Sequence, residues 1–213
     1  MIQLSISAAC AYVRKVMDEL ISVEEIGMLV SPDAVDLHKL VEGSIVEAAV
    51  KVHNLAPSVM IDGILGTAGT DYETSLTEKV LTITMKKDTI RVASVKASDS
   101  SIIVSDLVPE DSAEGRKQLD KYVRGVPDDP RLVLAKVWAG DNLPVLKYYT
   151  TEAAEVELYY VPYPEIEETI IMICPKLEYA VLNEIAAMVL DILGEHDKAA
   201  IYREKANKYM EGK

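Results

Sequence analysis

The chain has 213 residues, of which 49% are hydrophobic, and it carries a formal net charge of −13 at pH 7. A chain of this length and composition buries a core as one domain, or as one domain with an insertion, which excludes an intrinsically disordered protein. The negative charge argues against a protein that grips a nucleic-acid backbone, and no apolar run approaches the ~20 residues of a membrane span.

Two amphipathic helices are predicted at the start of the chain. The first spans about residues 5–21, where apolar side chains recur on one helical face, and it lacks the basic head and long apolar stretch of a secretion signal. The second is predicted to begin at Ser31-Pro32, a capping residue followed by a proline, and to end before Pro57. Its apolar stripe runs from Leu37 to Val52. We expect the two helices to form an antiparallel pair.

The segment GILGTAGTD, from Gly63 to Asp71, has a glycine at every third residue. A phosphate-binding loop needs a lysine followed by serine or threonine, and it connects a strand to a helix. This segment has no lysine, follows a predicted helix and precedes predicted strands. We therefore expect a mobile connection, with neither a nucleotide site nor a cofactor.

After residue 72 the hydrophobic pattern changes to the alternation of β-strands, with many β-branched residues. Turns are expected at Lys87-Asp88 and at Gly140-Asp141-Asn142. A short helix is predicted to start with Ser112 as its cap and to stop at Gly125. The expected strands cover residues 80–85, 90–95, 100–108, 131–140, 143–150 and 155–163.

Two further helices are predicted at the end of the chain. The first opens at Pro175, carries an apolar face as far as Ile192 and has Gly194 as its C-cap, and the last covers about residues 196–211. Strands between two helix pairs, without β–α–β alternation, predict the α+β class. The expected domains are a helical bundle formed by residues 1–60 and 174–213, and an inserted antiparallel β domain with a short helix in residues 72–165.

The sequence contains no recognisable catalytic constellation. His38, His53 and His196 lack metal-ligand spacing and are expected at the surface or on helix flanks, whereas Cys10 and Cys174 are expected to be buried free thiols. We therefore predict that the protein is not an enzyme and binds no metal. Two alternatives stay open: a cytosolic enzyme with a carboxylate-based site between helices and strands, and an adhesion module that uses its tyrosines.

An acidic run extends from the last predicted strand towards the C-terminal helices. It contains six glutamates and no lysine or arginine, and tyrosines are interleaved with the charges. Tyrosine among charged residues is typical of protein contacts. The glutamates are Glu152, Glu155, Glu157, Glu165, Glu167 and Glu168, and the tyrosines are Tyr159, Tyr160 and Tyr163.

The chain resembles the ring-forming adaptor, or tail tubular, proteins of short-tailed bacteriophages, including crAss-like phages. The likeness covers most of the chain, and it includes the order of helices, insertion and helices. It implies a non-enzymatic virion protein that forms a ring, typically of twelve copies, in the head-to-tail connector. The segments that carry it are RVASVKAS (91–98), LVPEDSAEGRKQLDKYVRGVPDDPRLVL (107–134), LKYYT (146–150) and PKLEYAVLNEIAAMVLDILGEHDKAAIYREKANKYM (175–210).

The resemblance also implies partners and a location. The ring would lie below the portal at the head–tail junction of the virion, after synthesis in the cytoplasm of the host bacterium. Its partners would be further copies of the chain, the portal or a neighbouring connector ring, and tail components, with no membrane. DNA would pass through the lumen without specific binding, because carboxylates repel phosphate. In such a ring we expect the acidic run and its tyrosines to line the channel or to contact a neighbouring protein.

Overall fold

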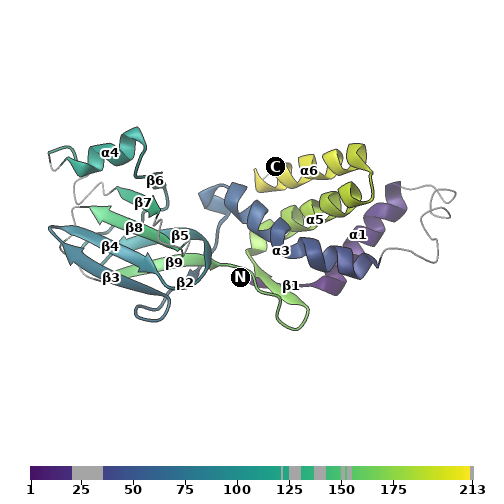
Figure 1. Ribbon diagram of the computed structural model, residues 1–213, viewed down its shortest axis with the longest axis horizontal. Helices are drawn as coiled ribbons and strands as arrows, with labels where there is room; N and C mark the ends of the chain where they lie inside the picture. The colour runs from purple at the N-terminus through teal and green to yellow at the C-terminus, as the bar shows by residue number, and fades with distance from the viewer. Residues whose placement is uncertain are drawn as a thin grey trace. The chain divides into compact units, whose positions relative to one another are not determined.

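The computed structural model of the chain belongs to the α+β class, as predicted (Figure 1). The chain divides into two compact units, a first unit of Met1–Ile61 with Pro164–Lys213 and a second unit of Asp62–Tyr163. The long helices belong to the first unit, and most of the strands belong to the second. The structure describes residues 1–20, 36–120, 122–124, 131–136, 143–149, 152 and 155–211.

The first unit is organised around one buried helix. Helix α5 (Glu178–Ile192) packs against α1 (Ile6–Leu20), α3 (Leu37–Leu55) and α6 (His196–Met210), and Figure 1 shows α5 and α6 side by side. Because α5 is covered by these helices, it buries residues on most of its circumference. The apolar stripe of α3 thus packs against α5, which joins the start of the chain to its C-terminal part.

The start of α3 differs from the prediction at Ser31-Pro32. Helix α3 begins at Leu37, because Asp36 has extended backbone angles and its carboxylate accepts the N–H of His38 at 3.1 Å. An aspartate cap of this kind marks the N-terminal end of the helix. Residues 31 and 32 themselves lie outside the described part of the chain. The other end is as predicted, since α3 stops at Leu55, ahead of Pro57.

A small two-stranded sheet of the first unit pairs the start of the chain with the segment that precedes α5. Strand β1 (Ile2–Ser5) pairs antiparallel with β10 (Ile170–Ile173), and neither strand was predicted. Four residues are too few for a clear alternation, so short strands of this kind give little signal in a sequence. The 3₁₀-helix η2 (Pro175–Leu177) then leads into α5, so Pro175 opens a 3₁₀ turn before the α-helix.

The second unit contains two sheets. The larger has the strand order β3-β4-β8-β7-β6 and the smaller has the order β2-β9-β5. Strands β6 and β7 run parallel and the other neighbours run antiparallel, whereas the sequence predicted antiparallel strands only. The elements are β2 (Ile64–Leu65), β3 (Tyr72–Thr77), β4 (Val80–Met85), β5 (Thr89–Ala97), β6 (Leu107–Pro109), α4 (Ala113–Leu119), β7 (Leu132–Lys136), β8 (Pro144–Tyr149) and β9 (Val156–Pro162), preceded by the 3₁₀-helix η1 (Ser58–Met60) of the first unit.

Buried side chains from both sheets form one hydrophobic cluster. The predicted strands around Lys87-Asp88 are present as β4 and β5, but they enter different sheets and do not pair with each other. Alternation sends every second side chain of β4 into the shared core, whereas an irregularity of the pairing between Val92 and Ser94 shifts the alternation of β5 by one residue. Their contributions are Leu81, Ile83 and Met85 from β4, and Val92, Val95 and Ala97 from β5.

The turn between β3 and β4 was missed in the sequence, whereas the cap of α4 was predicted. Strand β3 was not predicted, because its turn to β4 consists of Glu78 and Lys79, both with positive φ, where asparagine and glycine are usual. The cap of α4 is as predicted, since the Ser112 hydroxyl accepts the N–H of Gly115 at 3.0 Å. Helix α4 ends at Leu119, before the predicted stop, and Gly125 and the turn at residues 140–142 lie outside the described residues.

Candidate interaction site

The glycine segment is a packed part of the second unit and not the mobile connection that was predicted. Its first residues form β2, which pairs with β9. A Cβ atom at Gly63 would lie 2.8 Å from the backbone nitrogen of Tyr160, so only glycine allows this approach. Gly69 has a φ of 84°, in the left-handed region where glycine is favoured. The glycines therefore serve close packing and a turn.

Asp71 closes this segment and was not singled out from the sequence. Its Oδ2 accepts the N–H of Thr67 at 2.8 Å, and its Oδ1 lies 2.6 Å from the Nζ of Lys87. The hydrogen bond with Lys87, followed by the one from Thr67, lowers the pKa of the Asp71 carboxyl. An aspartate that accepts a nearby backbone N–H is a common turn signal, so the local sequence did contain a hint. The buried carboxylate fixes the loop.

The predicted contact residues are divided between the two units. Glu152, Glu155, Glu157 and the three tyrosines belong to the second unit, whereas Glu165, Glu167 and Glu168 belong to the first. The predicted contact residues thus come from both units, and their role in lining a channel or contacting a neighbouring protein stays a prediction.

In the second unit two of the three glutamates, Glu152 and Glu157, have polar partners. The Glu152 carboxylate lies 2.6 Å from the Nζ of Lys79, in the turn between β3 and β4, so a base compensates it after all. Glu157 on β9 accepts a hydrogen bond from the Tyr159 hydroxyl at 2.9 Å, which raises the pKa of that tyrosine. Glu155 is exposed just before β9. All three glutamates are exposed, so their carboxylates remain accessible to a partner.

The tyrosines differ in exposure. Tyr160 is buried in the hydrophobic cluster, so its assignment to a contact surface is wrong. The alternation of β9 explains the difference, because Tyr159 points to the opposite face of the strand and is only partly buried. Tyr163 follows the strand and is 47% exposed. Tyr148 and Tyr149 on β8 are buried as well.

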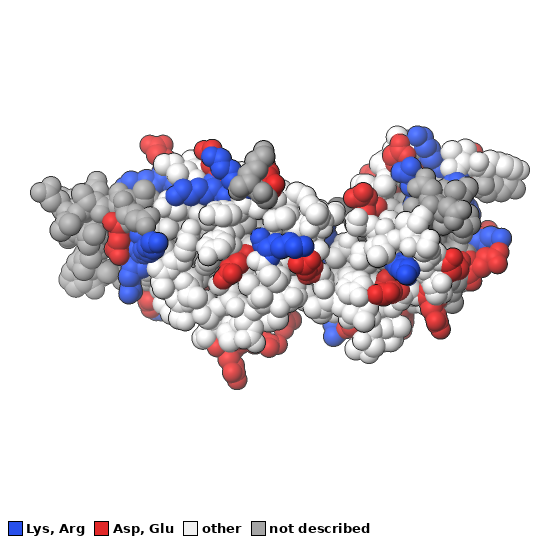
Figure 2. All heavy atoms as spheres, turned by 180° about the vertical axis from the view of Figure 1, so that it is seen from behind, with Lys and Arg blue, Asp and Glu red and all other residues white. Residues whose placement is uncertain are grey.

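The remaining glutamates lie on a tight turn in the first unit, which we call the acidic hairpin (residues 164–170). Its backbone is fixed by two hydrogen bonds between Glu167 and Ile170, at 3.0 and 2.8 Å. Glu168 and Thr169 between them both have positive φ, as a two-residue hairpin turn requires. Among the described residues, no lysine or arginine pairs with the three carboxylates, and Figure 2 shows red atoms projecting there at the lower edge of the first unit.

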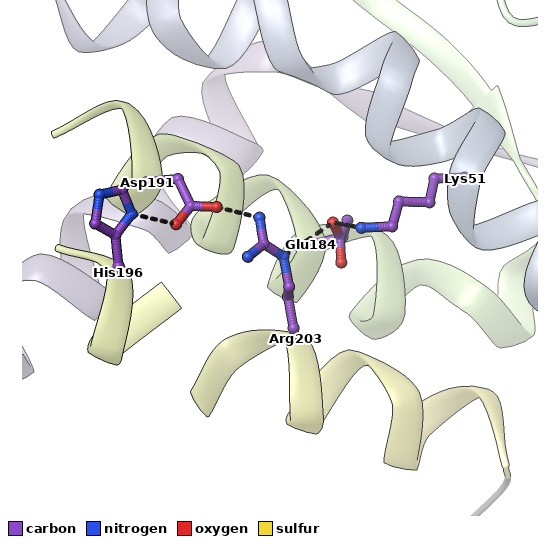
Figure 3. A network of polar contacts seen from close by, with 5 residues as sticks. All are labelled: Lys51, Glu184, Asp191, His196 and Arg203. Atoms are coloured by element: carbon purple, nitrogen blue, oxygen red, sulfur yellow. Dashed lines mark hydrogen bonds and ion pairs between the residues drawn. The ribbon is translucent and has the colours of Figure 1, made fainter. Parts of the chain in front are cut away.

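A second polar feature of the first unit connects three helices (Figure 3). The buried Glu184 carboxylate on α5 lies 2.6 Å from the Nζ of Lys51 on α3 and 3.8 Å from the Nε of Arg203 on α6. Arg203 also contacts Asp191, whose other oxygen lies 3.0 Å from the Nδ1 of His196. The hydrogen bond with His196, followed by the one from Arg203, lowers the pKa of the Asp191 carboxyl. The network compensates a buried charge and ties α3, α5 and α6 together.

His53 is buried, which corrects the expectation of a surface histidine. Its Nδ1 lies 2.7 Å from the carbonyl oxygen of Ala49, and its Nε2 accepts the N–H of Cys174 at 3.1 Å. The proton of the neutral ring is therefore on Nδ1. His38 is exposed near Glu42, as expected. Both cysteines are free thiols, but Cys10 is only partly buried.

Within the described ranges, no three histidine, cysteine, aspartate or glutamate side chains gather so that they could hold a metal ion. None of the helices described is long and apolar enough to cross a membrane. A comparison with models of known protein families and with curated proteins finds no match for this chain.

Proposed function

We propose that this chain is a non-enzymatic structural protein of a bacteriophage virion, which forms a ring in the head-to-tail connector below the portal. In this proposal the first unit is a helical bundle, and the second unit is a β domain inserted into it. Copies of the chain enclose the DNA channel and dock the next tail component. The surfaces of both units then serve contacts between proteins.

The observation that carries the proposal is the way the two ends of the chain come together. Helices from the first 55 residues pack against helices from residue 178 onward, and the strands β2 to β9 lie between them in the sequence. This is the order of elements that the resemblance to ring-forming connector proteins implies. A chain folded in this way presents helices for one set of contacts and a separate strand unit for another.

The distribution of charge supports the same proposal. Each copy carries a net charge of −13, and a ring multiplies this charge around its lumen. A negative lumen keeps the phosphate backbone from binding while DNA passes. The exposed glutamates of both units are also available for contacts with neighbouring proteins.

The proposal is tested on phage particles produced by the genome that encodes the chain. Antibody against the chain should label the junction of head and tail, and electron microscopy should show particles without tails when the chain is deleted. Restoring the full chain from a plasmid should restore the tails. If purified particles do not contain the chain, or if the deletion leaves the tails in place, the proposed function is wrong.

A further inference from the structure

The larger sheet of the second unit ends in an open strand edge. Strand β3 is its outermost strand and pairs only with β4 in that sheet (Figure 1). The strand has six residues, and from Glu73 to Thr77 all of them except Thr74 are exposed. An edge strand presents backbone N–H and C=O groups at every second residue, and another extended chain can bind these groups.

The hairpin that joins β3 to β4 shows which backbone groups face outwards. Its turn has two residues, so the flanking residues Thr77 and Val80 form a hydrogen-bonded pair within the hairpin. Hydrogen-bonded and non-hydrogen-bonded pairs alternate along antiparallel strands. The N–H and C=O groups of Thr74 and Leu76 therefore point away from β4, towards the open edge.

The start of the strand agrees with this alternation. The carbonyl oxygen of Tyr72 also points outwards, since it accepts the N–H of Gly69 at 2.7 Å. The backbone groups of Thr74 and Leu76 have no such acceptor or donor among the residues that the structure describes. The open edge thus offers donors and acceptors at the spacing that a further strand requires.

The other edges of the second unit are protected in ways that discourage pairing with other chains. Strand β6, at the opposite end of the larger sheet, has three residues and ends at Pro109, which has no N–H. In the smaller sheet, β2 has only two residues. Strand β5 is paired irregularly, and its Val95 exchanges two backbone hydrogen bonds with Val104. By contrast, β3 has a regular register and contains neither proline nor lysine.

We propose that β3 of one copy pairs antiparallel with β3 of a second copy when the chain is free of other proteins. A pairing centred on Ser75 sets Thr74 of each copy opposite Leu76 of the other. All of the outward N–H and C=O groups of these residues then form hydrogen bonds. The core faces of the two copies lie on the same side, so the two five-stranded sheets become one continuous sheet.

The side chains of β3 are compatible with this two-fold pairing. Leu76 is 39% exposed on the core face, and the second copy covers it with Thr74, its cross-strand neighbour. Glu73 is the only charged residue of the strand, and it lies opposite Thr77 of the second copy. The two Glu73 carboxylates are thus kept at opposite ends of the paired segment, and no like charges face each other.

This inference goes beyond the proposed function and does not depend on it. A contact between identical strands is isologous, so it joins copies in pairs, whereas a ring needs heterologous contacts. Pairing through β3 concerns the free chain, and other surfaces would build the ring.

The test places charges at the centre of the pair in the full-length chain. Directly opposite residues have Cβ atoms about 5 Å apart, so Ser75→Lys sets two lysines against each other and Ser75→Glu sets two glutamates. Sedimentation equilibrium at low ionic strength should show each variant dimerising at least about tenfold more weakly than the parent. An equimolar mixture of the two variants should recover the dimer, because lysine then lies opposite glutamate.

The matched controls are Ser101→Lys and Ser101→Glu, at an exposed serine of the second unit outside its strands. They should dimerise like the parent. The two Ser75 variants change the net charge in opposite directions, so a general effect of charge cannot weaken both. Melting temperatures should show that every variant is folded.

A second variant tests the backbone contact. Leu76→Pro removes an outward N–H group but leaves the pairing with β4 intact, since proline is tolerated where the N–H of an edge strand faces solvent. It should dimerise at least about tenfold more weakly than the parent. In the parent, the N–H of Thr74 should exchange with solvent more slowly as the protein concentration rises, and in Leu76→Pro this dependence should be lost.

Three outcomes would overturn the inference: a parent chain that stays monomeric at submillimolar concentration, a mixture that associates no better than either Ser75 variant alone, or a folded Leu76→Pro chain that dimerises like the parent. If Leu76→Pro does not fold, the Ser75 variants decide. A monomeric chain whose Thr74 N–H is protected only by another connector protein would assign the edge to that protein instead.

The location of the chain in particles is a separate result. The strand pairing can fail while the chain is found at the head–tail junction, and the proposed function can fail while the pairing is found.

Discussion

At the scale of single residues, His53 connects two segments that lie 121 positions apart in the sequence. The neutral ring donates from Nδ1 to Ala49 and accepts the Cys174 N–H at Nε2. A protonated ring cannot accept that hydrogen bond, because both nitrogens then carry protons. Burial lowers the pKa of His53 from its ordinary value, which agrees with this arrangement.

The first prediction concerns the pH dependence of stability. The folded pKa of His53 lies below the ordinary value of 6.5, so the unfolded chain binds this proton more readily. The contribution of His53 is therefore intact above pH 6.5, and stability falls as the pH drops below that value. The loss should reach at most about 1.4 kcal/mol per pH unit.

Thermal melts from about pH 8 to about pH 5 measure this effect, since histidine is the side chain that titrates in this range. The variant His53→Gln should be less stable at every pH but should lose less stability on acidification. The variant His38→Gln, at an exposed position, should follow the parent. An unchanged pH dependence in His53→Gln would contradict the role given to this ring.

The second prediction compares two glycines under the same substitution. Gly43 lies in α3 with open space around its Cβ position, so Gly43→Ala should raise the free energy of unfolding by about 1 kcal/mol. Gly115 faces Pro109 without room for a methyl group, so Gly115→Ala should lower it by about 2 kcal/mol. Urea denaturation of both variants measures the two changes in the free energy of unfolding. If Gly115→Ala raised this free energy as Gly43→Ala does, the close packing described at Gly115 would be refuted.

At the scale of elements, α5 is the helix on which the first unit depends. It buries apolar residues against three neighbouring helices, and it brings Glu184 between Lys51 and Arg203. A buried carboxylate is tolerated there because cations from two other helices compensate it. The network therefore specifies which faces of α3 and α6 pack against α5. Burial of apolar side chains alone would allow other faces to meet.

The third prediction tests this central position. Ile45 on α3 and Ile185 on α5 are fully buried, so Ile45→Asp or Ile185→Asp should cost several kcal/mol, on the order of 4, and unfold the first unit. Ile201→Asp on α6 is the matched control, because this isoleucine is 48% exposed. Circular dichroism at rising temperature measures all three. A melt like that of the parent for either buried variant would refute the helical packing.

The fourth prediction concerns the turn between β3 and β4. Glu78 and Lys79 have φ values of 51° and 63°, which cost more for these residues than for asparagine or glycine. Glu78→Asn keeps the ion pair of Lys79 with Glu152 and should stabilise the second unit by about 0.5 kcal/mol. The midpoint of urea denaturation should rise accordingly. A lower midpoint would mean that this strain is not present at residue 78.

At the scale of the whole molecule, the glycine segment is where the sequence comes nearest to an enzyme motif. In the structure, Gly63 and Gly66 lie against Tyr160, Leu158 and Tyr72, so the backbone faces protein and not a ligand. Asp71 and Lys87 are also paired with each other. The segment thus has a structural role in the second unit.

The fifth prediction follows from this packing. A panel of nucleoside di- and triphosphates with Mg²⁺ should leave the melting temperature of the chain unchanged, because the backbone of the glycine segment is packed against protein and is not available to hold the phosphates. A thermal shift assay measures this. Saturable stabilisation by a few kcal/mol at micromolar nucleotide would contradict the prediction and would favour the enzyme hypothesis.

The sequence by itself determined the features that depend on neighbours along the chain. The helical period of apolar residues located α1, α5 and α6, and the serine cap located the start of α4, because caps and helix faces involve residues a few positions apart. Alternation located β4, β5, β8 and β9 for the same reason. For the candidate contacts, the sequence identified the glutamates of the acidic hairpin, since charge is read directly.

The tertiary structure alone decided the features that depend on distant residues. It placed β4 and β5 in different sheets, buried Tyr160 while leaving Tyr163 exposed, and brought Lys79 to Glu152 from 73 positions away. It also showed that Leu119 and Tyr122 are exposed, because their exposure depends on what packs around the end of α4. The physical reason is common to all of these: strand pairing and burial are set by contacts between segments whose order in the chain does not reveal which of them meet.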